Sequence, residues 1–251
     1  MRLVLSLAAL LSAITLPALA ADEVEGTRNV NIERIAHGTH SFYEKDGVTL
    51  RGREYWRMIV HQDGTRTMNI TKDTFGTDRQ HTIVMRVDDR FRPLEAFGMY
   101  RYPTGNKGSV RVVIDGDTLT AQSFSPVGHV LDEHTVPETI VVVTHGEGLN
   151  SWSASVLDPD VEGGDYGPSE MARTSYFISP PKDGDGPVLG VITQSTLKRI
   201  GEETVTVPAG TFETVHYSTG TLEIWAMKGD RVLVKQTYNG EDYVLTDYTV
   251  E

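Results

Sequence analysis

Cysteine is absent from the 251 residues of this chain. That absence excludes disulfide bonds, cysteine-ligated zinc or iron–sulfur sites and thiol nucleophiles. Basic residues are also scarce: 23 lysines and arginines stand against 35 aspartates and glutamates, and the formal net charge is −12. A chain of this charge repels phosphate backbones and anionic lipid head groups, so no nucleic acid partner is expected.

Long hydrophobic runs are lacking everywhere except at the start of the chain. Residues 1–20 contain Arg2, an apolar run over Leu3–Leu16 and the small-residue sequence Ala18–Ala20. One positive charge, a hydrophobic segment and an A-x-A site are typical of a secretory signal peptide that is cleaved after Ala20.

An uncleaved membrane anchor is the alternative for this segment. Pro17 breaks a helix there and acidic residues begin at Asp22, which favours cleavage. The expected mature protein, residues 21–251, is periplasmic or secreted and has no stable membrane insertion.

Strand patterns dominate the mature chain, at a spacing of about ten residues between turn signals. Asp-Gly and Asn-Gly turns occur at Asp63-Gly64, Asp115-Gly116 and Asn239-Gly240. The segments with strand character are Val48–Val60, Thr65–Thr71, Gln80–Val87, Arg92–Tyr102, Val110–Ile114, Thr118–Phe124, Phe212–Tyr217, Thr221–Ala226, Arg231–Tyr238 and Tyr243–Val250. The pattern predicts an all-β fold, an antiparallel meander curled into a half-barrel or barrel-like sheet.

One short helix is predicted, over Gly148–Leu157, with Asn150 or Ser151 as its cap and Asp158-Pro159 as its end. A Gly- and Pro-rich loop over Ser179–Pro187 divides the chain. The segment after it is too short to build an independent core, so residues 21–251 are expected to form a single domain.

The C-terminal segment carries a resemblance to a known family. Glu202–Tyr217 contains the sequence V-P-A-G-T-F, and it is followed by the apolar strand Leu222–Trp225 and by Arg231–Lys235, which contains L-V-K. With the upstream turn at Arg92–Leu94, this order resembles the DUF3108 group of periplasmic proteins of unknown function. The resemblance implies a curved half-barrel like those of LolA-like and LolB-like lipoprotein carriers, which bind acyl chains on a concave apolar face. It implies no catalytic residue.

Histidines supply two candidate sites. His129, His134, His145 and Glu147 are the ligand types that zinc or another divalent metal prefers. On a strand, however, His129 and His134 point to opposite faces. The alternative to a metal site is that these side chains lie in loops, exposed to water.

His37 and His40 flank Gly38, and a tight turn there would let both rings act as a general-base pair. The same two rings can instead both face water.

Large aromatic side chains suggest a ligand site, or else an ordinary core. A curved sheet closed by one helix leaves a concave apolar mouth, and its candidate lining residues are Trp56, Tyr100, Tyr102, Trp152 and Trp225.

Three functions follow from these patterns. The first is binding of an apolar or amphiphilic small molecule or lipid, without a cofactor. The second is a secreted histidine-dependent hydrolase, lyase or isomerase that acts with or without a divalent metal. The third is an interaction protein of the cell envelope, with another envelope protein as its partner.

Overall fold

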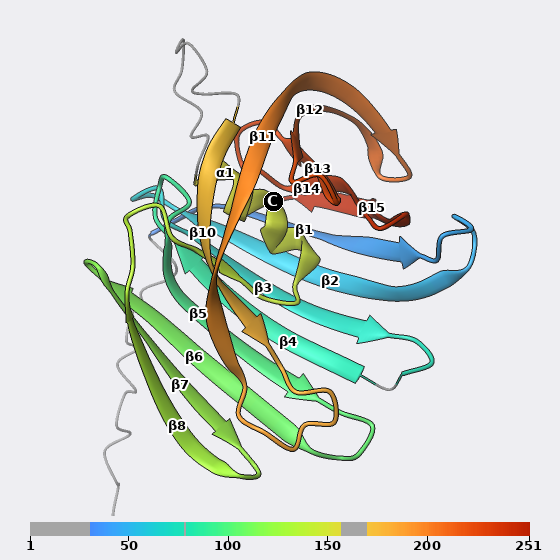
Figure 1. Ribbon diagram of the computed structural model, residues 1–251. Helices are drawn as coiled ribbons and strands as arrows, with labels where there is room; N and C mark the ends of the chain where they lie inside the picture. The colour runs from blue at the N-terminus through green and yellow to red at the C-terminus, as the bar shows by residue number, and fades with distance from the viewer. Residues whose placement is uncertain (1–30, 78, 157–169) are drawn as a thin grey trace, which may run out of the picture. The chain divides into compact units, whose positions relative to one another are not determined.

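The computed structural model describes residues 31–77, 79–156 and 170–251 (Figure 1). The predicted signal peptide and the predicted end of the helix at Asp158-Pro159 lie outside these residues. The described chain is all-β: fifteen strands belong to one sheet, and one short helical segment packs against it. This confirms the predicted fold class.

The sheet has an unusual order, β8-β7-β6-β5-β4-β3-β2-β1-β15-β14-β13-β12-β11-β10-β9. Two meanders therefore meet at the pair β1 and β15. The first meander consists of β1 (Ile32–Tyr43), β2 (Leu50–His61), β3 (Arg66–Thr74), β4 (Arg79–Val87), β5 (Pro93–Arg101), β6 (Lys107–Asp115), β7 (Thr118–Ser125) and β8 (Gly128–Thr135). The second consists of β9 (Val141–Val143), β10 (Glu170–Ser179), β11 (Leu189–Val207), β12 (Gly210–Ser218), β13 (Leu222–Met227), β14 (Leu233–Tyr238) and β15 (Glu241–Val250).

Pairing is antiparallel between all of these neighbours except β9 and β10, which run parallel. The predicted turns lie where strands reverse. Gly116 has a φ of 58° between β6 and β7, and Asn239 and Gly240 have φ values of 52° and 85° between β14 and β15. Two successive positive φ values are those of a type I′ turn, whose twist matches the flanking strands.

The turn expected at Gly38 is not formed, because β1 runs through it as a continuous strand. A Cβ on Gly38 would lie 2.4 Å from the carbonyl oxygen of Asp247 and 2.7 Å from the ring of Trp56. Glycine at this position therefore lets β1 pack closely against both neighbours, rather than reversing the chain.

The sheet is open and curled. Its end strands β8 and β9 do not pair with each other in the described part of the chain. The second meander turns back over the first, so that β9 approaches β5 and β11 approaches β7 (Figure 1). Val188, just before β11, is fully buried there, and its backbone N–H donates to Ser123 Oγ at 2.8 Å. The core fills the inside of this curl.

The helical segment also lies inside the curl. It begins as the 3₁₀ turn η1 (Glu147–Leu149) and continues as α1 (Asn150–Ser155), so it ends earlier than predicted. Neither Asn150 nor Ser151 is a cap, because the N-cap position of η1 is Gly146 and that of α1 is Leu149. No helix of the described residues is long and apolar enough to cross a membrane.

Candidate functional site

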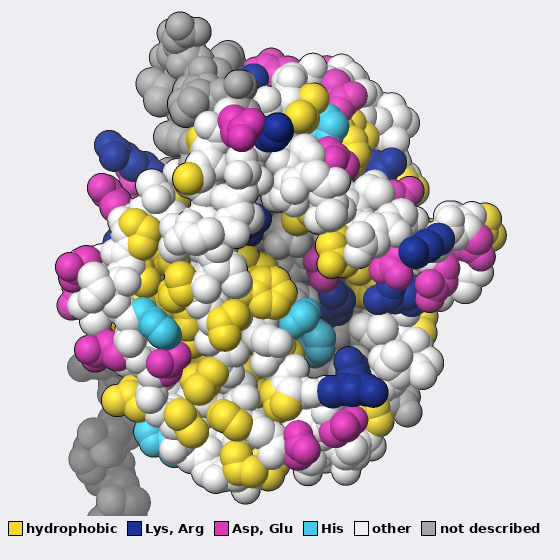
Figure 2. Space-filling view, in the orientation of Figure 1, with side chains coloured by type: hydrophobic (Ala, Val, Ile, Leu, Met, Phe, Trp, Pro, Cys, Tyr) yellow, Lys and Arg dark blue, Asp and Glu magenta, His cyan; other side chains and the backbone are white. Residues whose placement is uncertain are grey.

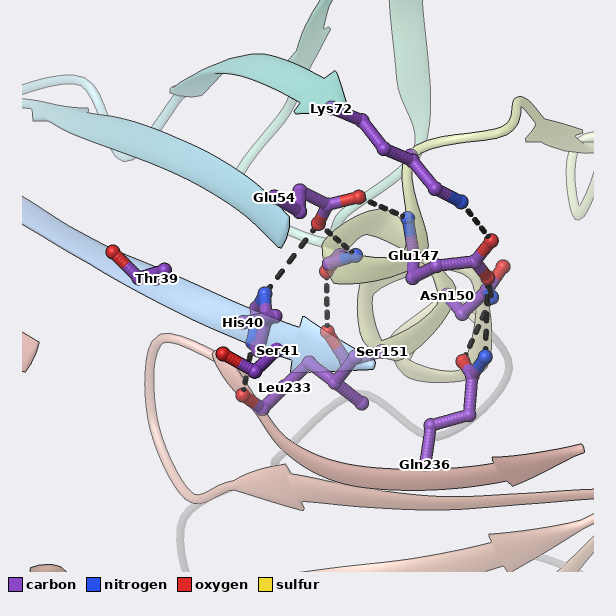
Figure 3. A network of polar contacts seen from close by, with 12 residues as sticks. Thr39, His40, Ser41, Glu54, Lys72, Glu147, Asn150, Ser151, Leu233 and Gln236 are labelled. Carbon is purple, nitrogen blue, oxygen red and sulfur yellow. Dashed lines mark hydrogen bonds and ion pairs between the residues drawn. The ribbon is translucent and has the colours of Figure 1, made fainter. Parts of the chain in front are cut away.

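A network of buried polar side chains joins the helical segment to both meanders (Figure 3). Its centre is Glu54 of β2, which is fully buried. The two oxygens of its carboxylate accept the backbone N–H groups of Glu147 and Gly148, both at 2.8 Å. A carboxylate that accepts two N–H groups in this way holds the first turn of the segment against the sheet.

His40 of β1 lies on the other side of Glu54. Its Nδ1 is 3.4 Å from Glu54 Oε1, and its Nε2 is 2.8 Å from the carbonyl oxygen of Leu233. A proton on Nε2 lets the ring donate to that carbonyl. His40 therefore ties β1 to β14 across the strand β15 that lies between them in the sheet.

Lys72 of β3 and Glu147 form the second part of the network. Lys72 Nζ donates to Glu147 Oε1 at 2.6 Å, while Glu147 Oε2 accepts the side-chain amides of Asn150 and Gln236 at 3.0 and 3.1 Å. Burial alone would raise the pKa of Glu147, but the charge of Lys72 and the hydrogen bonds from Lys72 and Gln236 together outweigh it, and the pKa is lowered. Glu147 is therefore an ionised carboxylate whose charge is balanced by Lys72.

This network forms part of the wall of a cavity of about 830 Å³ inside the curl. Figure 2 shows this face of the molecule hollowed, with histidine, lysine and arginine side chains visible in the hollow and hydrophobic ones beside it. Four large aromatic side chains are among the lining residues of the cavity: Phe75, Phe177, Tyr238 and Tyr243. Its volume lies within the range of small-molecule sites, about 300–1,000 Å³.

Two histidines, His81 and His145, line the same cavity with their ring centroids 5.7 Å apart. Burial lowers the pKa of both, and for His81, where the nearby charge of Lys72 acts in the same direction, it falls to about 3. Both rings are therefore neutral at physiological pH.

Charge in the cavity differs in sign from charge on the whole chain. Four cationic side chains line it, against three glutamates. Arg51 pairs with Glu241, Lys72 pairs with Glu147, and Arg79 donates to the carbonyl oxygen of Lys182 at 2.8 Å. The fourth cation is Arg173 of β10.

The structure does not bring the predicted histidine pair together. His37 is partly exposed, with its Nδ1 3.9 Å from a carboxylate oxygen of Glu251, whereas His40 is buried. The two residues are three apart on a continuous strand, and the side chains of a strand alternate between faces. Without the turn at Gly38, they share no substrate site.

The predicted metal ligands are also dispersed. His129 stacks on Phe124 at the end of the sheet, and His134 bonds to Asp132 at 2.8 Å. Only His145 and Glu147 lie at the cavity. Among the described residues, no three His, Asp or Glu side chains are grouped so that they would hold a metal ion.

The five predicted aromatic residues all lie away from the walls of the large cavity. Trp56, Tyr100 and Trp152 are buried in the core, and Tyr102 borders a separate pocket of about 580 Å³. Trp225 stacks on His216 with ring centroids 4.3 Å apart. The aromatic lining of the large cavity therefore comes from other residues than those predicted.

Glu54, Lys72, His81 and Arg173 are not among the site residues predicted from the sequence. A signal was present for two of them. Glu54 alternates in step with Trp56 and Met58, and Lys72 alternates in step with Met68 and Ile70, on the buried faces of their strands. A charged residue at a position of the apolar face indicates a buried ionic site.

Comparison with known proteins adds little to this geometry. No protein-family model and no curated protein matches the chain. Among solved structures, the chain is similar to a DUF1089 family protein from Pseudomonas aeruginosa, at 10% identity and a TM-score of 0.42, over 72% of this chain and 87% of that one. A likeness at this level carries no conclusion about activity. The resemblance to the DUF3108 group stays a prediction.

Proposed function

We propose that this chain is a periplasmic or secreted protein that binds an apolar or amphiphilic small molecule in the cavity inside its curled sheet. The observation that carries the proposal is the cavity itself, about 830 Å³ in volume, which is lined both by aromatic side chains and by polar groups held in hydrogen bonds. Sites for small molecules combine a mostly apolar lining with a few fixed polar groups in this way.

The polar network supports the proposal because it keeps one wall of the cavity in a fixed position. Lys72, Glu147, Asn150 and Gln236 line the cavity, and each is held by at least one other of the four. A wall that is ordered before the ligand arrives lowers the cost of binding. The location of the protein rests on residues 1–20 alone, and the resemblance of residues 202–235 to the DUF3108 group agrees with it.

The test uses N-phenyl-1-naphthylamine, a neutral apolar dye whose fluorescence rises in apolar surroundings. We expect the mature protein to bind it saturably, with one dye per chain. Thr193 of β11 lines the cavity, so Thr193→Trp should fill part of it and weaken binding about tenfold, equivalent to about 1.4 kcal/mol.

Thr196→Trp is the matched control, since Thr196 is exposed on the same strand and is not part of the lining. Its affinity for the dye should equal that of the wild type, and near-ultraviolet circular dichroism checks that both variants are folded. Absence of saturable binding by the wild type, or equal affinities of the two tryptophan variants, contradicts the proposed function.

A further inference from the structure

Arg173 is a buried cation in the wall of the cavity. It lies in the middle of β10 and is 6% exposed. Ser175 and Phe177, which follow it on the same face of the strand, line the cavity with it. Its guanidinium is therefore held between the sheet and the cavity rather than extended into bulk water.

Within the described residues, the guanidinium of Arg173 has neither an ion pair nor a hydrogen bond, and its buried Nε has no acceptor. The other three cations of the cavity, Arg51, Lys72 and Arg79, each have a carboxylate or a carbonyl partner. Arg173 is thus the one cationic group of the cavity that these residues leave uncompensated.

A buried charge without a partner is costly, and native proteins rarely keep one. Burial lowers the pKa of Arg173 to about 10, which leaves the group protonated at neutral pH. A planar guanidinium with free N–H donors matches the two oxygens of a carboxylate or another oxyanion. A bound anion would supply the charge that the chain does not.

We propose that the ligand of the cavity is an amphiphilic anion, whose oxyanion head group binds Arg173 and whose apolar body contacts the aromatic lining residues. This inference rests on the function proposed above. The volume and the aromatic lining of the cavity, far in excess of what a free inorganic anion needs, favour an amphiphile. Phe177, one of the aromatic lining residues, lies four residues further along β10, on the order of 13 Å away between Cα atoms.

The test compares two dyes with the same aromatic body. One is the neutral N-phenyl-1-naphthylamine, and the other is 1-anilinonaphthalene-8-sulfonate, which adds a sulfonate. We expect Arg173→Gln to weaken binding of the sulfonate dye about tenfold or more, as for loss of one charge-assisted hydrogen bond, and to change binding of the neutral dye by less than about twofold. Arg173→Lys should give an intermediate affinity for the sulfonate dye.

Arg79→Gln is the matched control, because it removes a cation of the same cavity that already has a protein partner. We expect a smaller loss of sulfonate-dye affinity than in Arg173→Gln. An equal loss in both variants, or unchanged sulfonate-dye binding in Arg173→Gln, overturns the inference and leaves the proposed function standing. If the wild type binds neither dye, both fail together.

Two further measurements test the inference without relying on dye binding by Arg173→Gln. The unliganded Arg173→Gln protein should melt at the same temperature as the wild type or higher, since it loses an uncompensated buried charge. A clear fall would assign Arg173 a structural role and contradict the inference.

In the wild type, laurate should displace the sulfonate dye at a concentration about tenfold below that of dodecan-1-ol. Acetate at the laurate concentration should leave the dye bound. Displacement by acetate, or equal potency of laurate and the alcohol, overturns the inference.

Discussion

His81 is a base that the native protein holds in its neutral form. It faces His145 and lies edge-on to Tyr100, with ring centroids 5.0 Å apart, and burial lowers its pKa to about 3. In an unfolded chain the same ring has a pKa near 6.5. Between these two values the unfolded state binds a proton that the native state does not, so acidification favours unfolding.

We therefore expect the free energy of unfolding to fall as the pH is lowered from 7 to 5, with His81 contributing up to about 1.4 kcal/mol per pH unit below pH 6.5. In His81→Gln this contribution is missing, so its stability should fall less steeply with pH. Urea unfolding at pH 7, 6 and 5 measures both slopes. His37→Gln, which changes a partly exposed histidine, is the control. Parallel slopes for wild type and His81→Gln would contradict this prediction.

Other buried charged residues show why the site was hard to predict. The sequence pattern predicts a strand over Val48–Val60 and a place for Trp56 at a ligand mouth, and it assigns no role to Glu54. The structure puts Glu54 and Trp56 on the same buried face, one in the polar network and the other in the core. The alternation of apolar and polar residues predicts which face of a strand a side chain occupies. It does not predict the residue that the side chain contacts, because that depends on how distant strands pack together. The chain does not specify locally that Glu54 meets the N–H groups of Glu147 and Gly148, 93 and 94 residues away.

At the scale of elements, η1 and α1 form a segment too short to be stable alone. An isolated helix of this length is unfavourable in water. The segment is held by side chains of the sheet: Glu54 binds its first N–H groups and Gln236 binds Asn150. Its position, and with it one wall of the cavity, therefore depends on β2 and β14.

Glu54→Ala removes the carboxylate and leaves two backbone N–H groups buried without acceptors. We expect the free energy of unfolding to fall by about 3–5 kcal/mol, the range for a buried charged group in several hydrogen bonds. Glu133→Ala, at an exposed position of β8, should change it by less than about 0.5 kcal/mol. Chemical unfolding of the three proteins measures both differences, and a small effect at Glu54 would show that the segment is held by other contacts.

Sequence patterns predicted the hairpins well and other strands poorly. The segments from β2 to β7 and from β12 to β15 are predicted correctly, because turn residues separate alternating strands there, with Asp-Gly or Asn-Gly between β2 and β3, β6 and β7, and β14 and β15. No strand is predicted over β1, where Gly38 is expected to form a turn. Strand β11 is largely polar and exposed over its 19 residues, so it lacks an apolar face to recognise. Its position comes from pairing with β10 and β12, which no local pattern contains.

At the scale of the whole molecule, the two meanders touch beside Val188. The hydrogen bond from its N–H to Ser123 Oγ is buried, and a Cβ on Gly108 of β6 would lie 2.6 Å from a methyl carbon of Val188. This contact joins the start of β11 to the strands β6 and β7. The contact therefore helps to hold the second meander against the first, on which the shape of the cavity depends.

Ser123→Ala should leave the Val188 N–H buried and unpaired, at a cost of about 1–3 kcal/mol. Because the loss acts on the contact between the meanders, we expect faster amide hydrogen exchange in β10 and in the first half of β11, with little change in β2 to β4. Ser125→Ala, at a less buried position of the same strand, is the control. Uniformly faster exchange over the whole sheet would contradict a local role for this contact.

The pair β1 and β15 has a consequence for the order of folding. All other neighbours in the sheet are consecutive in sequence, and apart from the parallel pair β9 and β10 they are antiparallel, so these strands can pair one hairpin at a time. The register from Ala36↔Val250 to Tyr43↔Asp242 instead joins segments about 200 residues apart. Such a contact closes a long loop and forms slowly. Until it forms, β1 has an open edge that can accept a wrong strand, and the cavity, whose walls come from both meanders, does not exist.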